Sequence, residues 1–161
     1  MTKYESSIKY NPAPVERVYE KISDLTSLRG LQERMSDPAF ADTLKQRAGE
    51  QIKPEQVQMI QDKVKDLQFD RDSITTNVEQ LGTTLTLRII EREEPKLVKM
   101  ELEGSPFPAN LWIQMLPASD GGTRLKLTVG VELNFFMRKM VDGKLKDGID
   151  RFADMVAMIP Y

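Results

Sequence analysis

The 161-residue sequence contains no cysteine and no histidine. Without cysteine there is no disulfide, no thiolate nucleophile and no zinc–thiolate site. Without histidine the chain lacks the commonest general base near neutral pH and a frequent metal ligand. Phosphate-binding loops and nucleophile–base constellations are absent as well. We therefore expect no metal and no cofactor.

The sequence also lacks an excess of charge of one sign and a long hydrophobic run. Its 23 basic and 25 acidic side chains give a net charge of -2, without the basic footprint of a nucleic-acid-binding protein. No apolar stretch reaches the roughly 18 residues of a membrane span, and the first ten residues do not resemble a secretory signal. We expect a cytoplasmic protein that binds no nucleic acid and has no transmembrane segment.

The composition is that of an ordinary globular domain, with 40% apolar and 30% charged residues. A chain of this length can bury roughly 70% of its unfolded surface, which is enough for one substantial core. We expect residues 1–161 to form a single domain.

The chain begins with a strand pattern that changes to a helical one. Residues 3–10 alternate, and the pattern puts Tyr10 on the inner face together with Tyr4, Ser6 and Ile8. The NPAP segment ends this strand, and Pro14 suits the first turn of a helix. The apolar side chains of that helix are Val15, Val18, Tyr19 and Ile22. Ser23 or Asp24 can cap a second short helix that carries Leu25, Leu28 and Leu31.

Residues 36–66 are polar and typical of helices. About 30 residues cannot bury a core of their own, so we interpret them as a helical insertion after the first strand, with a turn at Gly49. This insertion is a candidate contact surface for a protein partner.

From residue 67 to 134 the apolar period is two. Turn signals divide this region at Leu81-Gly82, Glu94-Pro95, Gly104 to Pro108 and Ser119 to Gly122. The pattern predicts an antiparallel meander, each strand with one buried face. Trp112 alternates with the inner residues of its strand and is therefore expected on the outer face.

Residues 137–159 predict one long amphipathic helix. At about 100 degrees per residue its apolar stripe contains Val141, Leu145, Gly148, Phe152, Val156 and Ile159. Charged pairs such as Asp142 with Lys146 are expected on a solvated face. Glycine costs a helix roughly 1 kcal/mol relative to alanine. Gly148 therefore indicates either close approach by the sheet or space left for a ligand.

Two stretches resemble a known family. The opening KYESSIKYNPAPVERVYEKISDLTSLRGL and the ending ELNFFMRKMVDGKLKDGIDRFADMVAMI are similar to START-like, helix-grip (SRPBCC-type) proteins, which include polyketide cyclases, dehydrases and lipid carriers. The resemblance covers the chain except residues 36–66. It implies an α+β fold in which a curved antiparallel sheet wraps around the C-terminal helix, with an apolar ligand between them. No catalytic motif of the family can be transferred to this chain.

The fold implied by this resemblance selects candidate ligand-binding residues. They are Tyr10, Met100, Phe107, Met115, Leu127, Gly148, Phe152 and Met155. The methionines suit either an adaptable pocket or ordinary core packing. Phe107 suits either a lip over the opening or an anchor for its loop, and the Tyr10 hydroxyl can orient a ligand or reach solvent.

Three functions follow from this pattern. The leading hypothesis is a carrier or sensor, rather than an enzyme, that encloses a small hydrophobic molecule of lipid or polyketide type. The second is a cyclase- or dehydrase-type enzyme that uses tyrosine, arginine or carboxylate groups in the cavity. The third is an interaction module that acts through residues 36–66 without a ligand.

Overall fold

A computed structural model describes residues 2–35, 37, 39, 42, 46, 55, 62, 66–78, 82–157, 159 and 161. The predicted insertion at 36–66, with its turn at Gly49, lies almost entirely outside these residues and stays a prediction.

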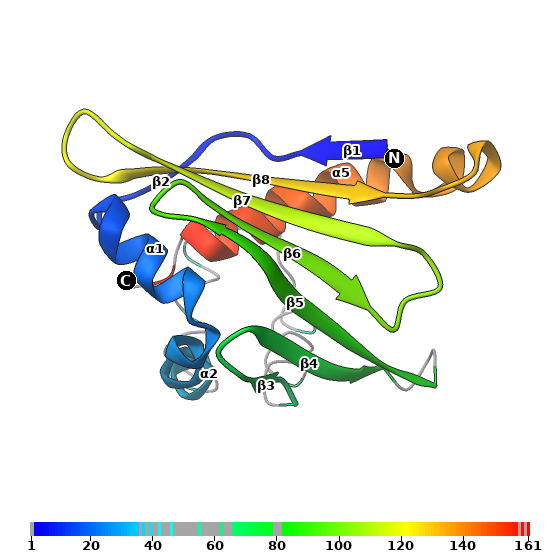
Figure 1. Ribbon diagram of the computed structural model, residues 1–161, viewed down its shortest axis with the longest axis horizontal. Coiled ribbons are helices and arrows are strands. Elements are labelled where there is room, and N and C mark those ends of the chain that lie inside the picture. The colour runs from blue at the N-terminus through cyan, green and yellow to red at the C-terminus, as the bar shows by residue number, and fades with distance from the viewer. Residues whose placement is uncertain are drawn as a thin grey trace.

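The described strands form one antiparallel sheet, and helices lie at both ends of the chain (Figure 1). The strands are β1 (Thr2–Glu5), β2 (Lys9–Asn11), β3 (Gln68–Phe69), β4 (Ser73–Val78), β5 (Thr83–Glu93), β6 (Leu97–Glu103), β7 (Ala109–Pro117) and β8 (Thr123–Val131). The helices are α1 (Val15–Ser23), the 3-10 helix η1 (Leu25–Leu28), α2 (Arg29–Met35) and α5 (Phe135–Ala157). None of the described helices is both long and apolar enough to cross a membrane.

The sheet order is β1-β8-β7-β6-β5-β4-β3, and β2 also pairs with β8. Helix α5 packs on β1, β2 and β8, whereas α1 packs on β6 and β7. Both helices bury side chains against the same face, which we call the inner face. This is the predicted helix-grip α+β architecture, and the predicted strands and turns of the meander are confirmed.

The helix starts follow local chemistry. Asp24 caps η1 by accepting a hydrogen bond from the Thr26 backbone N–H, as the sequence allows. Helix α5 begins two residues before its predicted start, because the Asn134 side chain accepts the Met137 backbone N–H at 2.8 Å.

The first strand differs from the prediction. It is two strands, because Ser6 leaves the β1 ladder and exchanges hydrogen bonds with the Leu127 backbone through its own N–H and hydroxyl. The alternation changes phase across this break. Tyr10 pairs with Arg124 and is 49% exposed, so its prediction as an inner-face residue was wrong.

Candidate ligand-binding site

The inner face divides into two parts that differ in burial. Cross-strand pairing aligns Ile74, Leu87 and Leu102, which we call the open row because all three are half-buried. A second part of the inner face is buried, with α1 packed on its β6 and β7 residues and α5 on its β8 residues. We call it the closed area: Ile89, Val98, Met100, Leu111, Ile113, Met115, Leu125 and Leu127. An apolar ligand can be accommodated only where such side chains are incompletely covered.

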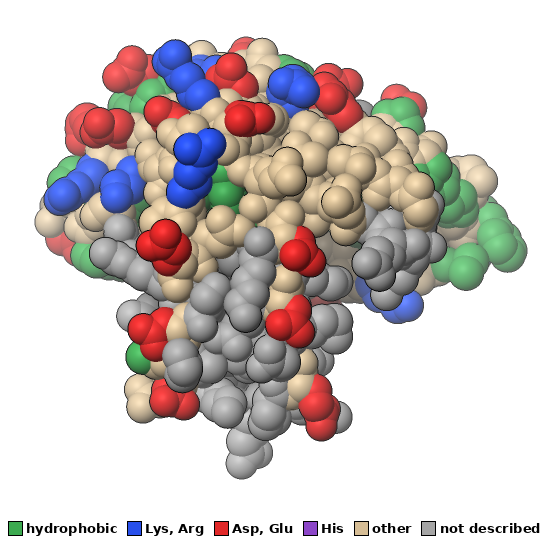
Figure 2. All heavy atoms as spheres, turned by 90° about the horizontal axis from the view of Figure 1, so that it is seen from below, with side chains coloured by type: hydrophobic (Ala, Val, Ile, Leu, Met, Phe, Trp, Pro, Cys, Tyr) green, Lys and Arg blue, Asp and Glu red, His purple; other side chains and the backbone are tan. Residues whose placement is uncertain are grey.

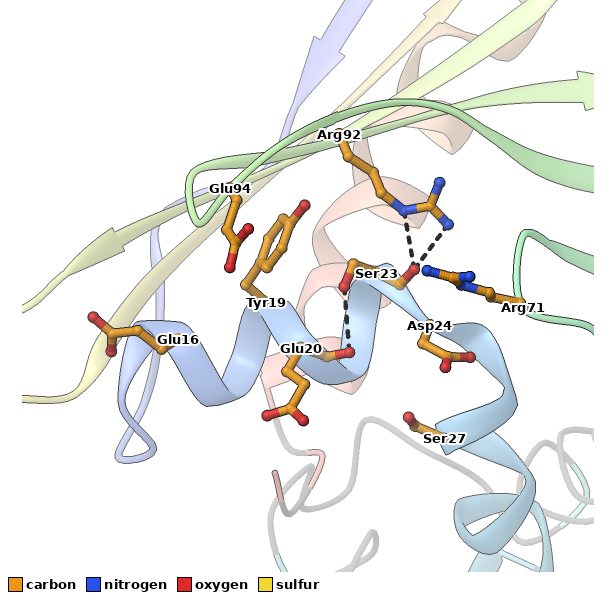
Figure 3. A pocket seen from close by; sticks show the side chains of 9 residues that line it. All are labelled: Glu16, Tyr19, Glu20, Ser23, Asp24, Ser27, Arg71, Arg92 and Glu94. Atoms are coloured by element: carbon orange, nitrogen blue, oxygen red, sulfur yellow. Dashed lines mark hydrogen bonds between the residues drawn. The ribbon is translucent and has the colours of Figure 1, made fainter.

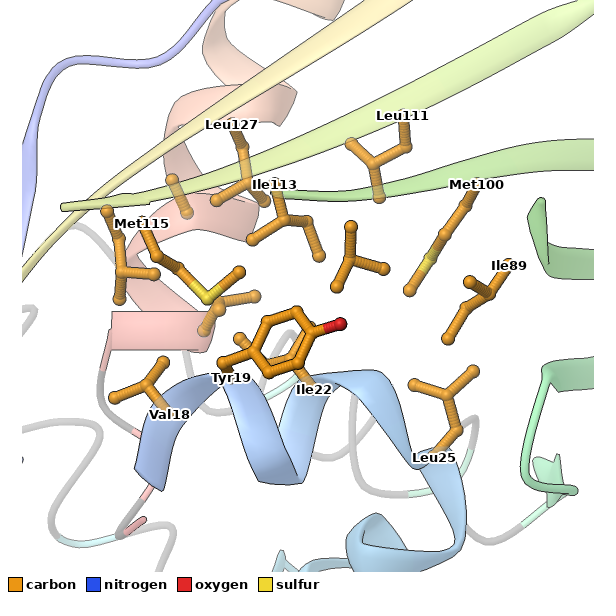
Figure 4. Packing of buried hydrophobic residues seen from close by; sticks show 14 of the residues in the cluster. Val18, Tyr19, Ile22, Leu25, Ile89, Met100, Leu111, Ile113, Met115 and Leu127 are labelled. Carbon is orange, nitrogen blue, oxygen red and sulfur yellow. The ribbon is translucent and has the colours of Figure 1, made fainter. Parts of the chain in front are cut away.

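Helix α1 covers the part of the closed area that belongs to β6 and β7. Its apolar side chains point onto the strands and meet the sheet directly, as Figure 4 shows for Val18, Tyr19 and Ile22. Three predicted ligand contacts, Met100, Met115 and Leu127, belong to this packed core. Core packing was one of the two interpretations of the methionines, and the structure places Met100 and Met115 in the core.

Helix α5 is rotated relative to its predicted stripe. Ile149, Ala153 and Val156 are its buried residues, whereas Phe152 is 40% exposed. Gly148 is exposed as well, and a Cβ added there would meet nothing within 4 Å. The predicted burial of these two residues was therefore wrong, and the sheet backbone does not approach Gly148. Met155 is half-buried.

A polar seam between α5 and the first strands accounts for this rotation. The Asp150 carboxylate accepts hydrogen bonds from the Ser7 backbone N–H and hydroxyl, both at 2.9 Å. The Lys9 ammonium binds Asp150 at 3.1 Å and Asp154 at 2.9 Å. The Tyr4 hydroxyl donates to Asp142. Because these contacts turn the acidic edge of α5 toward β1 and β2, the side with Gly148 faces away from the core.

The seam also shifts protonation equilibria. The Ser7 backbone N–H, followed by the Lys9 ammonium, lowers the pKa of Asp150. Burial lowers the pKa of Lys9, but its hydrogen bonds with Asp154 and Asp150 outweigh that effect and raise it. Sequence reasoning missed this seam, because helix charges were expected on a solvated face.

Tyr4 brings a polar group to the inner face beside the closed area. It is buried and pairs with Val129, which itself opposes Leu111. The hydrogen bond to Asp142 raises the pKa of the Tyr4 phenol, so this group stays protonated near neutral pH. It can orient the polar end of a ligand but does not act as a base.

The described residues lack two further kinds of functional site, metal-binding clusters and unpaired buried polar side-chain atoms. They contain no cluster of acidic side chains that could hold a metal ion. Within the same part of the chain, no buried side-chain nitrogen or oxygen lacks a hydrogen-bond partner.

The loop between β6 and β7 lies at the same end as the open row. Leu102 of that row pairs with Ala109, the first residue of β7, so the loop connects the two directly. Phe107 in this loop is half-buried, and its N–H donates to the Ser105 hydroxyl at 3.2 Å. The Glu132 N–H holds the loop by donating to the Pro108 carbonyl at 3.1 Å.

Two further aromatic residues lie on the outer surface. Trp112 is on the outer face, as predicted, between the ammonium groups of Lys3 and Lys99 at 4.9 and 5.2 Å from its ring centre. Tyr10 donates its hydroxyl to Asp120. That bond, followed by the Gly122 N–H, lowers the pKa of Asp120. Both contacts are remote from the inner face.

A separate polar hollow of about 580 Å³ lies between α1, η1 and the end of β5 (Figure 3). Its lining residues are Glu16, Tyr19, Glu20, Ser23, Asp24, Ser27, Arg71, Arg92 and Glu94. Arg92 is already engaged, since it donates to the Ser23 carbonyl and to Asp72. No sequence motif signalled this hollow, because its residues come from three separate segments.

Comparison with known proteins shows the fold. No protein-family model matches the chain, and no curated protein matches it. Among solved structures, a protein from Thermobifida fusca is 13% identical, with a TM-score of 0.57 over 98% of this chain and 91% of that chain. A conserved protein from Geobacillus kaustophilus is 16% identical, with a TM-score of 0.53 over 97% of this chain and 93% of that chain.

A START superfamily protein from Mycobacterium smegmatis is 12% identical and aligns over 96% of this chain and 98% of its own, at a TM-score of 0.49. The likenesses to the Thermobifida and Geobacillus proteins are too distant to show more than the fold. The chain has the helix-grip α+β fold that the opening and closing segments predict.

Proposed function

We propose that this protein is a carrier or sensor that encloses a small hydrophobic molecule between the open row and α5. The observation that carries the proposal is the uneven covering of the inner face. The closed area is sealed by α1 and α5, whereas the apolar side chains of Ile74, Leu87 and Leu102 keep part of their surface exposed.

The chemistry of this region suits a lipid- or polyketide-like guest. Burying apolar surface releases roughly 25 cal/mol per Å², so half-covered leucine and isoleucine side chains provide affinity for an apolar molecule. Val129 and Leu145 extend the half-buried surface from the sheet to α5. Tyr4 supplies a hydroxyl for one polar group of the guest, and Phe107 is a candidate lip.

Native mass spectrometry of the freshly purified protein tests this proposal. We expect an additional retained mass that organic extraction removes, together with the same molecule in the extract. Recovery of the bare chain alone, from cells and after incubation with fatty acids and polyketide-like probes, would count against a ligand carrier.

A substitution that fills the open row tests the location. Leu87→Trp is expected to abolish retention of the extracted molecule while the protein remains folded, because the larger side chain occupies the free volume. Leu116→Trp is the matched control, since Leu116 is 57% exposed away from the inner face. Retention that survives Leu87→Trp would place the guest elsewhere.

A further inference from the structure

The first turns of α5 expose apolar side chains to solvent. Phe135, Phe136 and Met140 are 66%, 74% and 67% exposed, the highest values among the large hydrophobic side chains of the described residues. We call these three residues the apolar tip. Hydrophobic side chains gather at the end of the molecule where α5 begins, as Figure 2 shows. Burial in the core does not explain them.

Basic side chains surround the apolar tip. The Lys139 ammonium lies 4.7 Å from the centre of the Phe135 ring, and the Arg138 guanidinium lies 5.9 Å from it. From residue 135 to 144 there are three basic residues, Arg138, Lys139 and Lys144, and one acidic residue, Asp142, giving +3 - 1 = +2. The whole chain carries -2, so the charge of this stretch is opposite to that of the protein.

Aromatic and apolar side chains beside lysine and arginine are the combination that binds a lipid bilayer at its interface. The apolar groups enter the boundary between headgroups and acyl chains, and the cations attract anionic headgroups. We propose that the apolar tip docks this protein reversibly on bilayers that contain anionic lipids.

The size of the tip favours a bilayer over a protein partner. A stable protein interface buries roughly 800 Å² on each side. A fully buried aromatic side chain contributes about 150–250 Å². Two phenylalanines and a methionine that are already partly covered do not reach the area of a stable dimer interface, whereas interfacial anchoring needs only a few such groups.

The tip lies at the end of the sheet that carries the open row. Helix α5 follows β8, in which Val131 pairs with Ala109, and Ala109 pairs with Leu102 of the open row. Docking through the tip therefore brings this end of the inner face toward the lipid. Transfer of a guest at that point rests on the proposed function, but docking itself does not.

Co-sedimentation with vesicles tests the docking. Vesicles of phosphatidylcholine alone are compared with vesicles of equal parts phosphatidylcholine and phosphatidylglycerol. The protein is expected to sediment with the mixed vesicles and only weakly with phosphatidylcholine alone. The triple variant Phe135→Ser, Phe136→Ser and Met140→Ser is expected to lose this binding, with circular dichroism as the check on folding.

A second variant keeps the helix and its apolar side chains but removes the cations. Arg138→Gln with Lys139→Gln is expected to lower binding to the mixed vesicles by roughly tenfold or more, because each basic residue near the surface contributes to the electrostatic attraction. Leu116→Ser is the control, since it removes an exposed apolar side chain at another place and is expected to leave binding unchanged.

Three results would overturn the docking proposal: no binding to either vesicle, equal loss of binding with Leu116→Ser, or a dimer in light scattering that the triple variant abolishes. The last result would assign the tip to a second copy of the chain. Native mass spectrometry of the triple variant separates this proposal from the proposed function, because a docking-deficient protein is still expected to retain its ligand.

Discussion

The closed area and the open row belong to the same face of the same sheet, yet different things cover them. Helices α1 and α5 pack apolar side chains onto the closed area, where Val98, Met115, Leu125 and Leu127 have no exposed surface. Helix α5 contacts β1, β2 and β8 and does not cover the open row in this way. The alternation of a strand therefore indicates which side chains face inward, but not whether they are filled core or free lining.

The largest expected difference between the closed area and the open row is in the unfolding free energy lost when a side chain is truncated to alanine. Met115→Ala should lower the free energy of unfolding by about 2–5 kcal/mol, because it leaves a cavity in a packed core. Leu87→Ala in the open row should cost less than half as much, since Leu87 is only half-buried. Urea unfolding of both variants measures the difference. Equal losses would mean that the open row is packed as tightly as the closed area.

The two ends of α5 should also differ in stability. At its C-terminal end, the Asn11 amide donates to the carbonyls of Ala157 and Ile159 at 2.7 and 3.0 Å. Asn11→Ala removes both of these donated bonds, although the Ile159 carbonyl still accepts from the Tyr161 N–H, and should cost about 1–3 kcal/mol of unfolding free energy. Asn134→Ala at the other end removes only an N-cap and should cost about 1 kcal/mol.

Asn11→Asp is the matched control for this pair. It retains an oxygen for the Ala13 N–H but removes both donated bonds and adds a negative charge near the C-terminus of α5. A stability close to wild type for Asn11→Asp would show that the amide does not hold this end of the helix.

Acid should weaken the seam that orients α5. The pKa of Asp150 is lowered in the folded state, so its stabilisation is present above the ordinary value of 3.8 and is lost as pH falls through the lower, folded value. Asp150→Asn does not titrate. The difference in unfolding free energy between wild type and Asp150→Asn, measured by urea titration, should therefore narrow from pH 5 toward pH 2.

This effect should be less than about 1 kcal/mol, because the Asp150 side chain is 42% exposed and water screens its ion pair. A difference that stays constant over this pH range would show that the charge of Asp150 does not contribute to the seam.

One expected change is a gain in stability. Gly148→Ala should stabilise the protein by roughly 1 kcal/mol, because the residue is exposed and an added Cβ meets nothing within 4 Å. Gly143→Ala, in an equally open position on the same helix, should behave alike. Thermal unfolding measures both. If Gly148→Ala lost the retained ligand and Gly143→Ala did not, Gly148 would belong to the binding site.

Most of the architecture was predictable because its signals are local. The alternation of residues 67–134 and the glycine and proline positions between the strands predicted the meander, which is confirmed. At Gly104 the reason is visible: its φ is +87°, and a Cβ would lie 2.2 Å from the Thr84 carbonyl oxygen. Only glycine fits that turn.

The candidate site was less predictable, because it depends on contacts between distant segments. The inward prediction for Tyr10 failed when Ser6 bonded to Leu127 and shifted the phase of the next strand. The predicted burial of Gly148 failed because the partners of Asp150 come from residues far away in the chain. Phe107 and Met155 are half-buried, and their part in binding stays a prediction.

The sequence by itself determined the kinds of elements, their order and the turns between them, because backbone geometry and side-chain period act over a few residues. Only the tertiary structure decided which apolar side chains α1 seals and which face α5 turns inward. Those outcomes rest on hydrogen bonds and packing between segments far apart in the chain, and no local pattern records such a choice.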